Sequence, residues 1–278
     1  MALIQVDYFS KALLRQVHFQ AILPFDKVYF DDVVREQKPF KTLYLLHGVF
    51  GDETDWVNGT RIVRWAQDRN LAVIMPAGEN KFYVDHDKST DQFSQYIEEL
   101  VVQTRKIFPL SENREDTYIA GLSMGGYGAI VNGLKYNTLF SRIAGLSAAL
   151  HIETFVNASE EALLPIMRRS YLESVFGDLD KLLGSNKDFH SLAKKLVEKE
   201  ADLPKVYLAC GTEDDLYKWD HAFYEELQEL GYEITWKEIP GGHDWDFWDR
   251  MILDVLNWLP LDDQEEALSS GHIQEDAQ

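Results

Sequence analysis

Apolar and polar positions follow two different patterns along the 278-residue chain. The segments IQVDYFS (4–10) and LRQVHFQAILP (14–24) alternate apolar and polar residues, as half-buried antiparallel strands do. TLYLLHG (42–48) and LAVIMP (71–76) are nearly continuous apolar runs, which is typical of strands covered on both faces. The start of the chain therefore predicts an antiparallel pair beside a fully enclosed sheet.

Amphipathic helices alternate with the later apolar runs. In DQFSQYIEELVVQTRKIF (91–108) the apolar residues fall at helical spacing on one stripe. Buried strands that alternate with such helices predict an α/β protein with a mostly parallel central sheet and helices on both faces. Further strands are predicted at 116–121, 142–150, 205–211 and 233–240, and further helices at 60–70, 125–136, 218–230 and 245–259.

The length of the chain fits one large hydrophobic core, so residues 1–260 are predicted to form a single domain. Residues 151–204, between the sixth and seventh strands, are too many for an ordinary strand connection. We expect them to be an insertion, with a lid over the carboxyl edge of the sheet as one interpretation. The acidic tail 261–278 holds few large apolar residues and is expected to be flexible.

Charge and composition exclude several classes of protein. The net charge of −20 repels nucleic acid and anionic lipid head groups, so neither a nucleic acid nor a membrane is expected as a partner. No run approaches a membrane span and the N-terminus lacks a signal-peptide pattern, which favours a cytoplasmic protein. Cys210 is the single cysteine and is interpreted as a small core residue. No metal-binding or nucleotide-binding motif is found, so neither a metal nor a cofactor is expected.

Four glycines surround one serine in GLSMGGYG (121–128), between a predicted strand and a predicted helix. Gly121 to Gly125 fit the pattern G-x-S-x-G, which in α/β-hydrolases places a nucleophilic serine on a strained turn between strand and helix. The helix that follows directs its N-terminal amides at the same point, which favours a developing negative charge. Ser123 is therefore the candidate nucleophile.

A serine nucleophile needs a histidine base and an acid that orients it. His243 follows a predicted strand and two glycines and precedes the last helix, which is the expected place for the base. His151 opens the insertion and is a candidate pocket residue, whereas His190 and His221 are expected on the surface. The turn after the strand 205–211 offers Glu213, Asp214 and Asp215 as acids; loop position favours Asp214 in part, and the choice between Asp214 and Asp215 stays open at this point.

Two backbone amides are candidates for the oxyanion hole, the pair of donors that holds the negative oxygen of the reacting carbonyl. One is the N–H of Met124, directly after the serine, and the other is the N–H of Val49, in the loop that ends TLYLLHG. His47 in the same loop is expected to fix the loop by hydrogen bonding. Aromatic residues near the predicted site could bind substrate or pack in the core; the candidate pocket residues are Trp56, Tyr83, His151, Trp219 and Trp245, with Phe82 nearby.

The segments YLLHGVFGDETDW, GLSMGGYGA, CGTEDDLY and GGHDWDFW, in this order and spacing, resemble the esterase D family of α/β-hydrolases. Within it they are most similar to bacterial tributyrin esterases and to acetyl- and feruloyl-esterases, over roughly residues 2–260. The resemblance implies the α/β-hydrolase fold, Ser123, Asp214 and His243 as triad, and Val49 and Met124 as oxyanion donors. Related S-formylglutathione hydrolases carry a cysteine in the loop after the third strand, which is absent here, where the loop reads HGVFG (47–51).

The sequence thus predicts a serine carboxylesterase for short-chain esters, acetyl to butyryl, with hydroxycinnamoyl esters of carbohydrates as a further substrate class. Hydrolysis of S-formylglutathione or another thioester is the first alternative, and acyl transfer to an alcohol is the second. A catalytically silent hydrolase fold used for binding is the alternative from another class, but it gives no reason for a complete triad and strained glycines. The sequence leaves open whether the chain forms a homo-oligomer.

Overall fold

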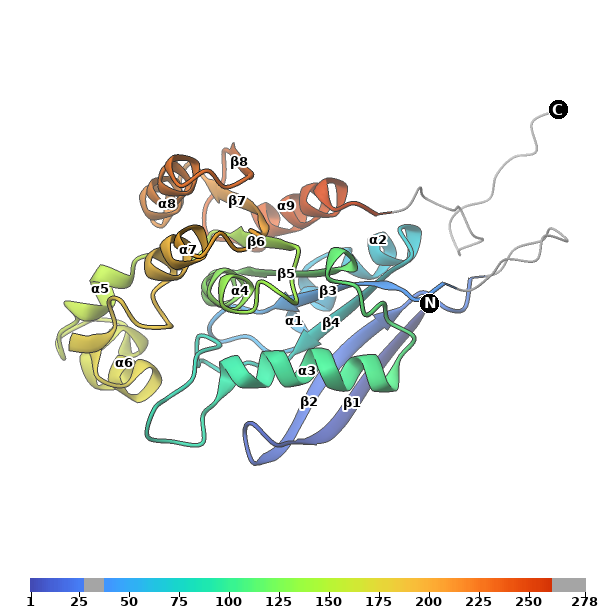
Figure 1. Cartoon of the computed structure of the whole chain (residues 1–278), viewed down its shortest axis with the longest axis horizontal. Coiled ribbons are helices and arrows are strands. Elements are labelled where there is room, and N and C mark those ends of the chain that lie inside the picture. Colours follow the sequence, from blue (N-terminus) through green and yellow to red (C-terminus); the bar gives the residue numbers. More distant parts are fainter. Residues whose placement is uncertain (28–37, 262–278) are drawn as a thin grey trace, which may run out of the picture.

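A single eight-stranded sheet runs through the protein (Figure 1). The computed structural model describes residues 1–27 and 38–261. The strands lie in the order β1-β2-β4-β3-β5-β6-β7-β8, in which β1 pairs antiparallel with β2, β2 pairs antiparallel with β4, and all later pairs are parallel. The strands are β1 Ala2–Ser10, β2 Arg15–Leu23, β3 Lys41–Leu46, β4 Leu71–Pro76, β5 Thr117–Leu122, β6 Arg142–Leu146, β7 Lys205–Gly211 and β8 Ile234–Ile239.

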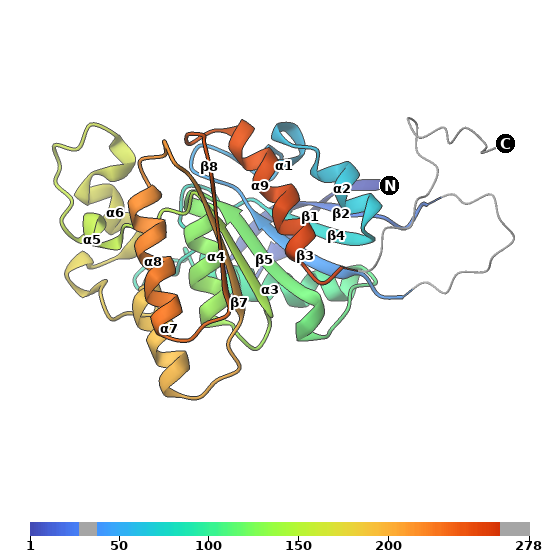
Figure 2. The same cartoon turned by 90° about the horizontal axis from the view of Figure 1, so that it is seen from above.

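The helices cover both faces of this sheet, as the hydrophobic pattern predicts (Figure 2). The apolar stripes of α3, α4 and α8 pack into one hydrophobic cluster, and those of α1, α2 and α9 pack into a second cluster on the opposite face. Burial of this apolar surface is the main favourable contribution to folding. The helices are α1 Asp55–Gly59, α2 Ile62–Asp68, α3 Phe93–Ile107, α4 Met124–Lys135, α5 Ile152–Val156, α6 Arg169–Phe176, α7 Phe189–Glu198, α8 Tyr217–Glu229 and α9 Trp245–Trp258.

The connection between β6 and β7 contains α5, α6 and α7 and two short 3₁₀ turns. Its helices gather beside α4 and α8, at one end of the molecule (Figures 1 and 2). Phe155, Phe176 and Phe189 of this segment belong to the same hydrophobic cluster as α4, so the segment packs on the main core. A lid role for 151–204 remains a prediction.

One strand boundary differs from the prediction, and one predicted segment cannot be compared with the structure. β3 ends at Leu46, where its pairing with β5 stops, rather than at Gly48, and the ring nitrogens of His47 hold the turn that follows. The flexible tail predicted at 261–278 lies outside the described residues, apart from Leu261. No helix within residues 1–27 and 38–261 has the length and apolar character needed to cross a bilayer.

Candidate active site

Ser123 occupies a single strained position between β5 and α4. Its backbone has φ 52° and ψ −120°. Residues other than glycine avoid positive φ because their Cβ is crowded there, and the cost is about 1–2 kcal/mol. Three hydrogen bonds hold Ser123 there: its N–H donates to Leu146, and its carbonyl oxygen accepts from the amides of Tyr127 (3.0 Å) and Ala149 (3.1 Å). The turn therefore raises the hydroxyl group at the carboxyl edge of the sheet, as the glycine-serine pattern predicts.

The glycines around Ser123 are explained by the close approach of α4 to the sheet. A Cβ at Gly121 would lie 2.3 Å from the carbonyl oxygen of Gly125, and a Cβ at Gly125 would lie 2.4 Å from that of Leu46. Both contacts are with backbone atoms, which cannot rotate away. Only glycine therefore lets the first turn of α4 pack this tightly against β3 and β5.

Ser123, His243 and Asp214 form a continuous hydrogen-bonded chain. The Oγ of Ser123 lies 3.0 Å from Nε2 of His243, and Nδ1 of His243 lies 2.9 Å from Oδ2 of Asp214. Because the carboxylate accepts the Nδ1 proton, Nε2 is left as the acceptor for the serine hydroxyl. The three residues follow β5, β7 and β8, so the parallel sheet brings three loops together at its carboxyl edge.

Asp214 is held in its charged form. Its burial opposes the charge, but hydrogen bonds from His243 and from the amide of Leu216 (2.9 Å) outweigh this effect, so the pKa of Asp214 lies below its usual value. Glu213 and Asp215, the other two acids of the turn, are exposed to solvent. The structure thus separates the three carboxylates that the sequence left as alternatives.

The loop after β3 carries the second predicted oxyanion donor. Nδ1 of His47 donates to the carbonyl oxygen of Gly48 (2.7 Å), and its Nε2 accepts from the amide of Gly78 (2.8 Å). Burial lowers the pKa of His47, which keeps the ring neutral in this double role. A Cβ on Gly48 would lie 3.5 Å from that of Ser123, so the loop passes directly beside the nucleophile.

The two candidate oxyanion amides remain available to a ligand. Within residues 1–27 and 38–261, neither the N–H of Val49 nor that of Met124 has a hydrogen-bond acceptor. The N–H of Met124 also lies at the N-terminus of α4, where the helix dipole favours negative charge. Two such unpaired donors on either side of a serine suit a developing oxyanion.

Asp220 and Ser147 are buried polar residues close to the triad that the sequence analysis does not single out. Asp220 on α8 is fully buried, and its Oδ2 accepts a hydrogen bond from the amide of Ala148 (2.7 Å). Burial raises its pKa well above the usual value, with the charge of Asp214 adding to the effect. Ser147 accepts a hydrogen bond from the indole of Trp248 (3.2 Å), and Cys210 is a buried core residue as predicted. This group supports the loop that leads to His151.

The predicted pocket residues fall into two groups. His151, Trp219 and Trp245 are partly exposed, and the ring of His151 lies 6.5 Å from that of Trp219. Trp56 and Tyr83 are fully buried, and each donates a hydrogen bond to the backbone, Trp56 to Leu46 and Tyr83 to His47. These two residues support the catalytic loops from beneath and present no surface to a substrate, so their prediction as pocket residues is wrong. Phe82 is buried in the same way.

Of the other histidines weighed as bases, His190 and His221 make contacts outside the triad. His190 on α7 contacts Glu226, and the ring of His221 on α8 stacks on Tyr217. His151 is different, because burial and the neighbouring His243 lower its pKa to about 4. It is therefore a neutral imidazole beside the catalytic one.

Sequence comparison agrees with this geometry. The sequence model of the putative esterase family matches residues 10–259, which is most of the chain. The chain belongs to the putative esterase family. The esterase is 41% identical over 263 residues to an acetyl esterase of Caldicellulosiruptor saccharolyticus, a match that covers 93% of this chain and 98% of that protein.

Solved structures give the same result. The fluorophosphonate-binding serine hydrolase FphF of Staphylococcus aureus is 32% identical and superimposes with a TM-score of 0.82, over 93% of this chain and 98% of that one. An S-formylglutathione hydrolase (FrmB) of the same organism is also 32% identical, with a TM-score of 0.78 and the same coverage. The esterase therefore has the α/β-hydrolase fold, and it is a serine carboxylic ester hydrolase.

Proposed function

We propose that this esterase hydrolyses short-chain acyl esters through an acyl-enzyme intermediate on Ser123. The observation that carries the proposal is the hydrogen-bonded chain Ser123–His243–Asp214, with distances of 3.0 and 2.9 Å. A neutral imidazole that accepts from a serine hydroxyl and donates to a buried carboxylate is the arrangement that makes serine a nucleophile.

Acylation uses the groups already in place. Ser123 Oγ attacks the ester carbonyl carbon while its proton passes to Nε2 of His243. The amides of Val49 and Met124 hold the resulting oxyanion, and each such donor contributes on the order of 3 kcal/mol to transition-state stabilisation. The charge of Asp214 stabilises the imidazolium. The intermediate then collapses, the carbon–oxygen bond to the alcohol breaks, and His243 returns its proton to the departing alkoxide.

Deacylation repeats these steps with water. His243 takes a proton from a water molecule that attacks the acyl carbon, the same two amides hold the second oxyanion, and the bond to Ser123 Oγ breaks. The proton on His243 returns to Ser123, and the carboxylic acid leaves. No cofactor or metal is required for this sequence of steps.

Acetyl to butyryl esters are the proposed substrates, with hydroxycinnamoyl esters of carbohydrates as a second class. The name of the 41% identical relative, acetyl esterase, supports the short acyl group. His151, Trp219 and Trp245 are partly exposed and are proposed to bind the substrate, the two indoles by stacking on a sugar or phenolic ring.

Thioester hydrolysis is a second candidate, because a relative of 32% identity is named an S-formylglutathione hydrolase. One feature argues against it. The S-formylglutathione hydrolases that the sequence resembles carry a cysteine in the loop after the third strand, whereas the single cysteine of this chain, Cys210, is buried in β7. The thioester is therefore tested beside the oxygen esters.

The test compares hydrolysis of p-nitrophenyl acetate, butyrate and octanoate with that of methyl ferulate and S-formylglutathione. Ser123→Ala is assayed in parallel, with Ser174→Ala, an exposed serine of α6, as matched control. We expect the highest kcat/KM with acetate and butyrate, its loss in Ser123→Ala and no change in Ser174→Ala. A clear preference for the thioester would replace the proposal with the second candidate. Equal rates in Ser123→Ala and the wild type would exclude Ser123 as nucleophile.

A further inference from the structure

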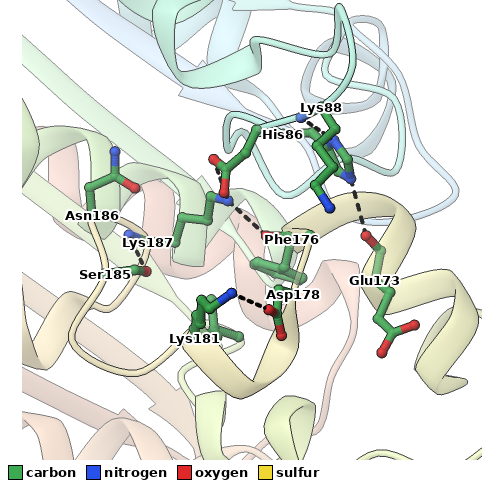
Figure 3. A pocket seen from close by; sticks show the side chains of 12 residues that line it. His86, Lys88, Glu173, Phe176, Asp178, Lys181, Ser185, Asn186 and Lys187 are labelled. Carbon is green, nitrogen blue, oxygen red and sulfur yellow. Dashed lines mark hydrogen bonds and ion pairs between the residues drawn. The ribbon is translucent and has the colours of Figure 1, made fainter.

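A cavity of about 440 Å³ lies between two segments of the esterase that are distant in sequence (Figure 3). One wall is the loop at His86–Lys88, and the other is the end of α6 with the turn that leads to Lys187. Its volume falls within the range of small-molecule sites, about 300–1,000 Å³. The described residues that line it include no member of the triad and no oxyanion donor.

Lys187 is the buried cation of this cavity. Its side chain is only 6% exposed, and its Nζ donates to the carbonyl oxygen of Phe176 (2.7 Å) and to Oδ1 of Asp87 (3.3 Å). An ammonium group has three N–H donors, so one of them has no partner among the described residues. The contact with Asp87 is long for a charged pair, and the Asp87 side chain is 75% exposed, so this carboxylate can rotate into solvent.

Two further lysines border the same space. Figure 3 shows Lys88 on one wall and Lys181 on the opposite wall, where the ammonium group of Lys181 is directed at Asp178 of its own segment. The carboxylate of Glu173 points away from the cavity in Figure 3 and pairs with Arg169, so it does not neutralise this group. Lys88, Lys181 and Lys187 share the lining of the cavity with Asp87, Glu173 and Asp178, and Lys187 is the buried one of the three lysines.

The walls of the cavity are connected without a ligand. The amide of Lys88 donates to Nδ1 of His86 (3.1 Å), which leaves the Nε2 proton of His86 to donate to the carbonyl oxygen of Glu173 (3.2 Å). His86 therefore joins the loop to α6. A site whose walls are already in place loses less conformational entropy when a ligand binds.

We propose that this cavity binds a small molecule with a phosphate or carboxylate group. The anion takes the position of the Asp87 carboxylate on Lys187, and Lys88 and Lys181 supply further positive charge. Asp87 thus competes with the ligand for the ammonium group of Lys187 and pairs with it when no ligand is bound. Lysine suits this role because its ammonium group binds phosphate and carboxylate oxygens as a point charge.

The described residues that line the proposed site are different from the triad residues and the oxyanion donors. The ring of Phe176 lies 5.2 Å from both Phe82 and Phe155, and these buried rings form an apolar wall behind the cavity. Tyr127 packs among these rings and links the two regions, because its hydroxyl donates to the carbonyl oxygen of Lys187 and its amide donates to that of Ser123. Because no catalytic residue lines the cavity, the ligand does not have to be the reacting ester, and its binding can be measured without catalysis.

Isothermal titration calorimetry of the Ser123→Ala protein tests the site, with inorganic phosphate and citrate as anions and glucose as a neutral ligand of similar polarity. The phosphate and citrate arms separate the two anion classes. We expect one or both anions to bind, more weakly as the salt concentration rises, and glucose not to bind. Lys187→Gln is expected to weaken binding at least about 10-fold, because a charged hydrogen bond is lost. Lys88→Ala is expected to weaken it a few-fold, which provides a second variant if Lys187→Gln does not fold.

Asp87→Asn provides the decisive comparison, because it should bind the anion about 3-fold more tightly once the competing charge is removed. Lys194→Gln, on the exposed surface of α7, removes one positive charge as Lys187→Gln and Lys88→Ala do, and it is the control for that change of net charge. Anion binding that is unchanged in Lys88→Ala and in Asp87→Asn would overturn the proposal. The absence of binding by both anions to the folded Ser123→Ala protein at low salt would overturn it as well, as would glucose binding alone.

Discussion

Nδ1 of His243 lies 2.9 Å from Oδ2 of Asp214, and no other carboxylate of the same turn is buried with it. The side chain of Asp214 is 1% exposed, whereas that of His243 is 38% exposed. The acid is therefore fixed inside the protein and the base stands at the surface, where it can reach both Ser123 and a substrate. Substitution of Asp214 should therefore affect catalysis, whereas substitution of its exposed neighbour Asp215 should not.

Asp214→Asn is expected to lower kcat by about 10³- to 10⁴-fold, because an amide at this position favours the wrong imidazole tautomer and cannot stabilise its charge. Asp215→Asn, one residue later and exposed, should keep wild-type activity. The measurement is kcat for p-nitrophenyl acetate in both variants. A large loss in Asp215→Asn with little loss in Asp214→Asn would reverse the assignment.

The strain at Ser123 predicts a difference in stability between two inactive variants. Glycine adopts positive φ without steric cost, whereas alanine keeps the Cβ. Ser123→Gly should therefore be about 1 kcal/mol more stable than Ser123→Ala in urea unfolding at neutral pH. Equal free energies of unfolding would mean that the surrounding hydrogen bonds, rather than the φ angle, decide the stability of this turn.

Gly125→Ala should reduce both stability and activity. Its Cβ would lie 2.4 Å from the carbonyl oxygen of Leu46 and 2.5 Å from that of His47, so α4 has to move away from β3. We expect a loss of about 1–3 kcal/mol in the free energy of unfolding, and a lower kcat because Ser123 and the Met124 amide move with the helix.

Gly184→Ala is the matched control for this change, because nothing lies within 4 Å of its added Cβ. Its φ of +79° gives a cost of about 1 kcal/mol, with unchanged kcat. If Gly125→Ala kept full activity and lost no more stability than the control, the close approach would not be needed for catalysis.

His151 predicts a specific loss of stability in acid. Its pKa is about 4 in the folded protein, below the 6.5 of a solvated imidazole, so the unfolded chain binds the proton first as the pH falls. Its contribution is complete above pH 6.5 and is lost progressively down to about pH 4, by about 3 kcal/mol at most. His151→Gln should therefore lose less stability than the wild type between pH 7 and pH 5.

His47 titrates in the same direction, so the variant keeps part of the acid sensitivity. Urea unfolding at both pH values gives the comparison, with His221→Gln on α8 as control. Parallel losses in the wild type and His151→Gln would show that His151 is not buried as a neutral ring.

The sheet, its helices on both faces and the triad could be predicted because each has a short-range signal. Continuous short apolar runs are typical of strands covered on both faces, and the glycines around Ser123 reflect a steric requirement that only glycine meets. The short helix α1 had no such signal, since five residues are fewer than two turns.

The structural roles of Trp56, Tyr83 and Asp220 depend on contacts across the fold. Whether an indole lines a pocket or fills the core is decided by what packs on it, here Trp245 against Trp56. Asp220 looks like any acidic residue of an exposed helix, and only its contact with the amide of Ala148, 72 residues away, shows that it is buried. The cavity at Lys187 likewise joins loops 100 residues apart.

The nucleophile and its base are 120 residues apart, and β6, β7 and β8 all lie between them in the chain. During synthesis, Ser123 and its turn can form long before His243 leaves the ribosome. A nascent or truncated chain that ends before residue 243 therefore carries a serine without its base, and it is chemically inert however well its first strands have folded. Ester hydrolysis by this protein thus reports the completion of the last βα unit.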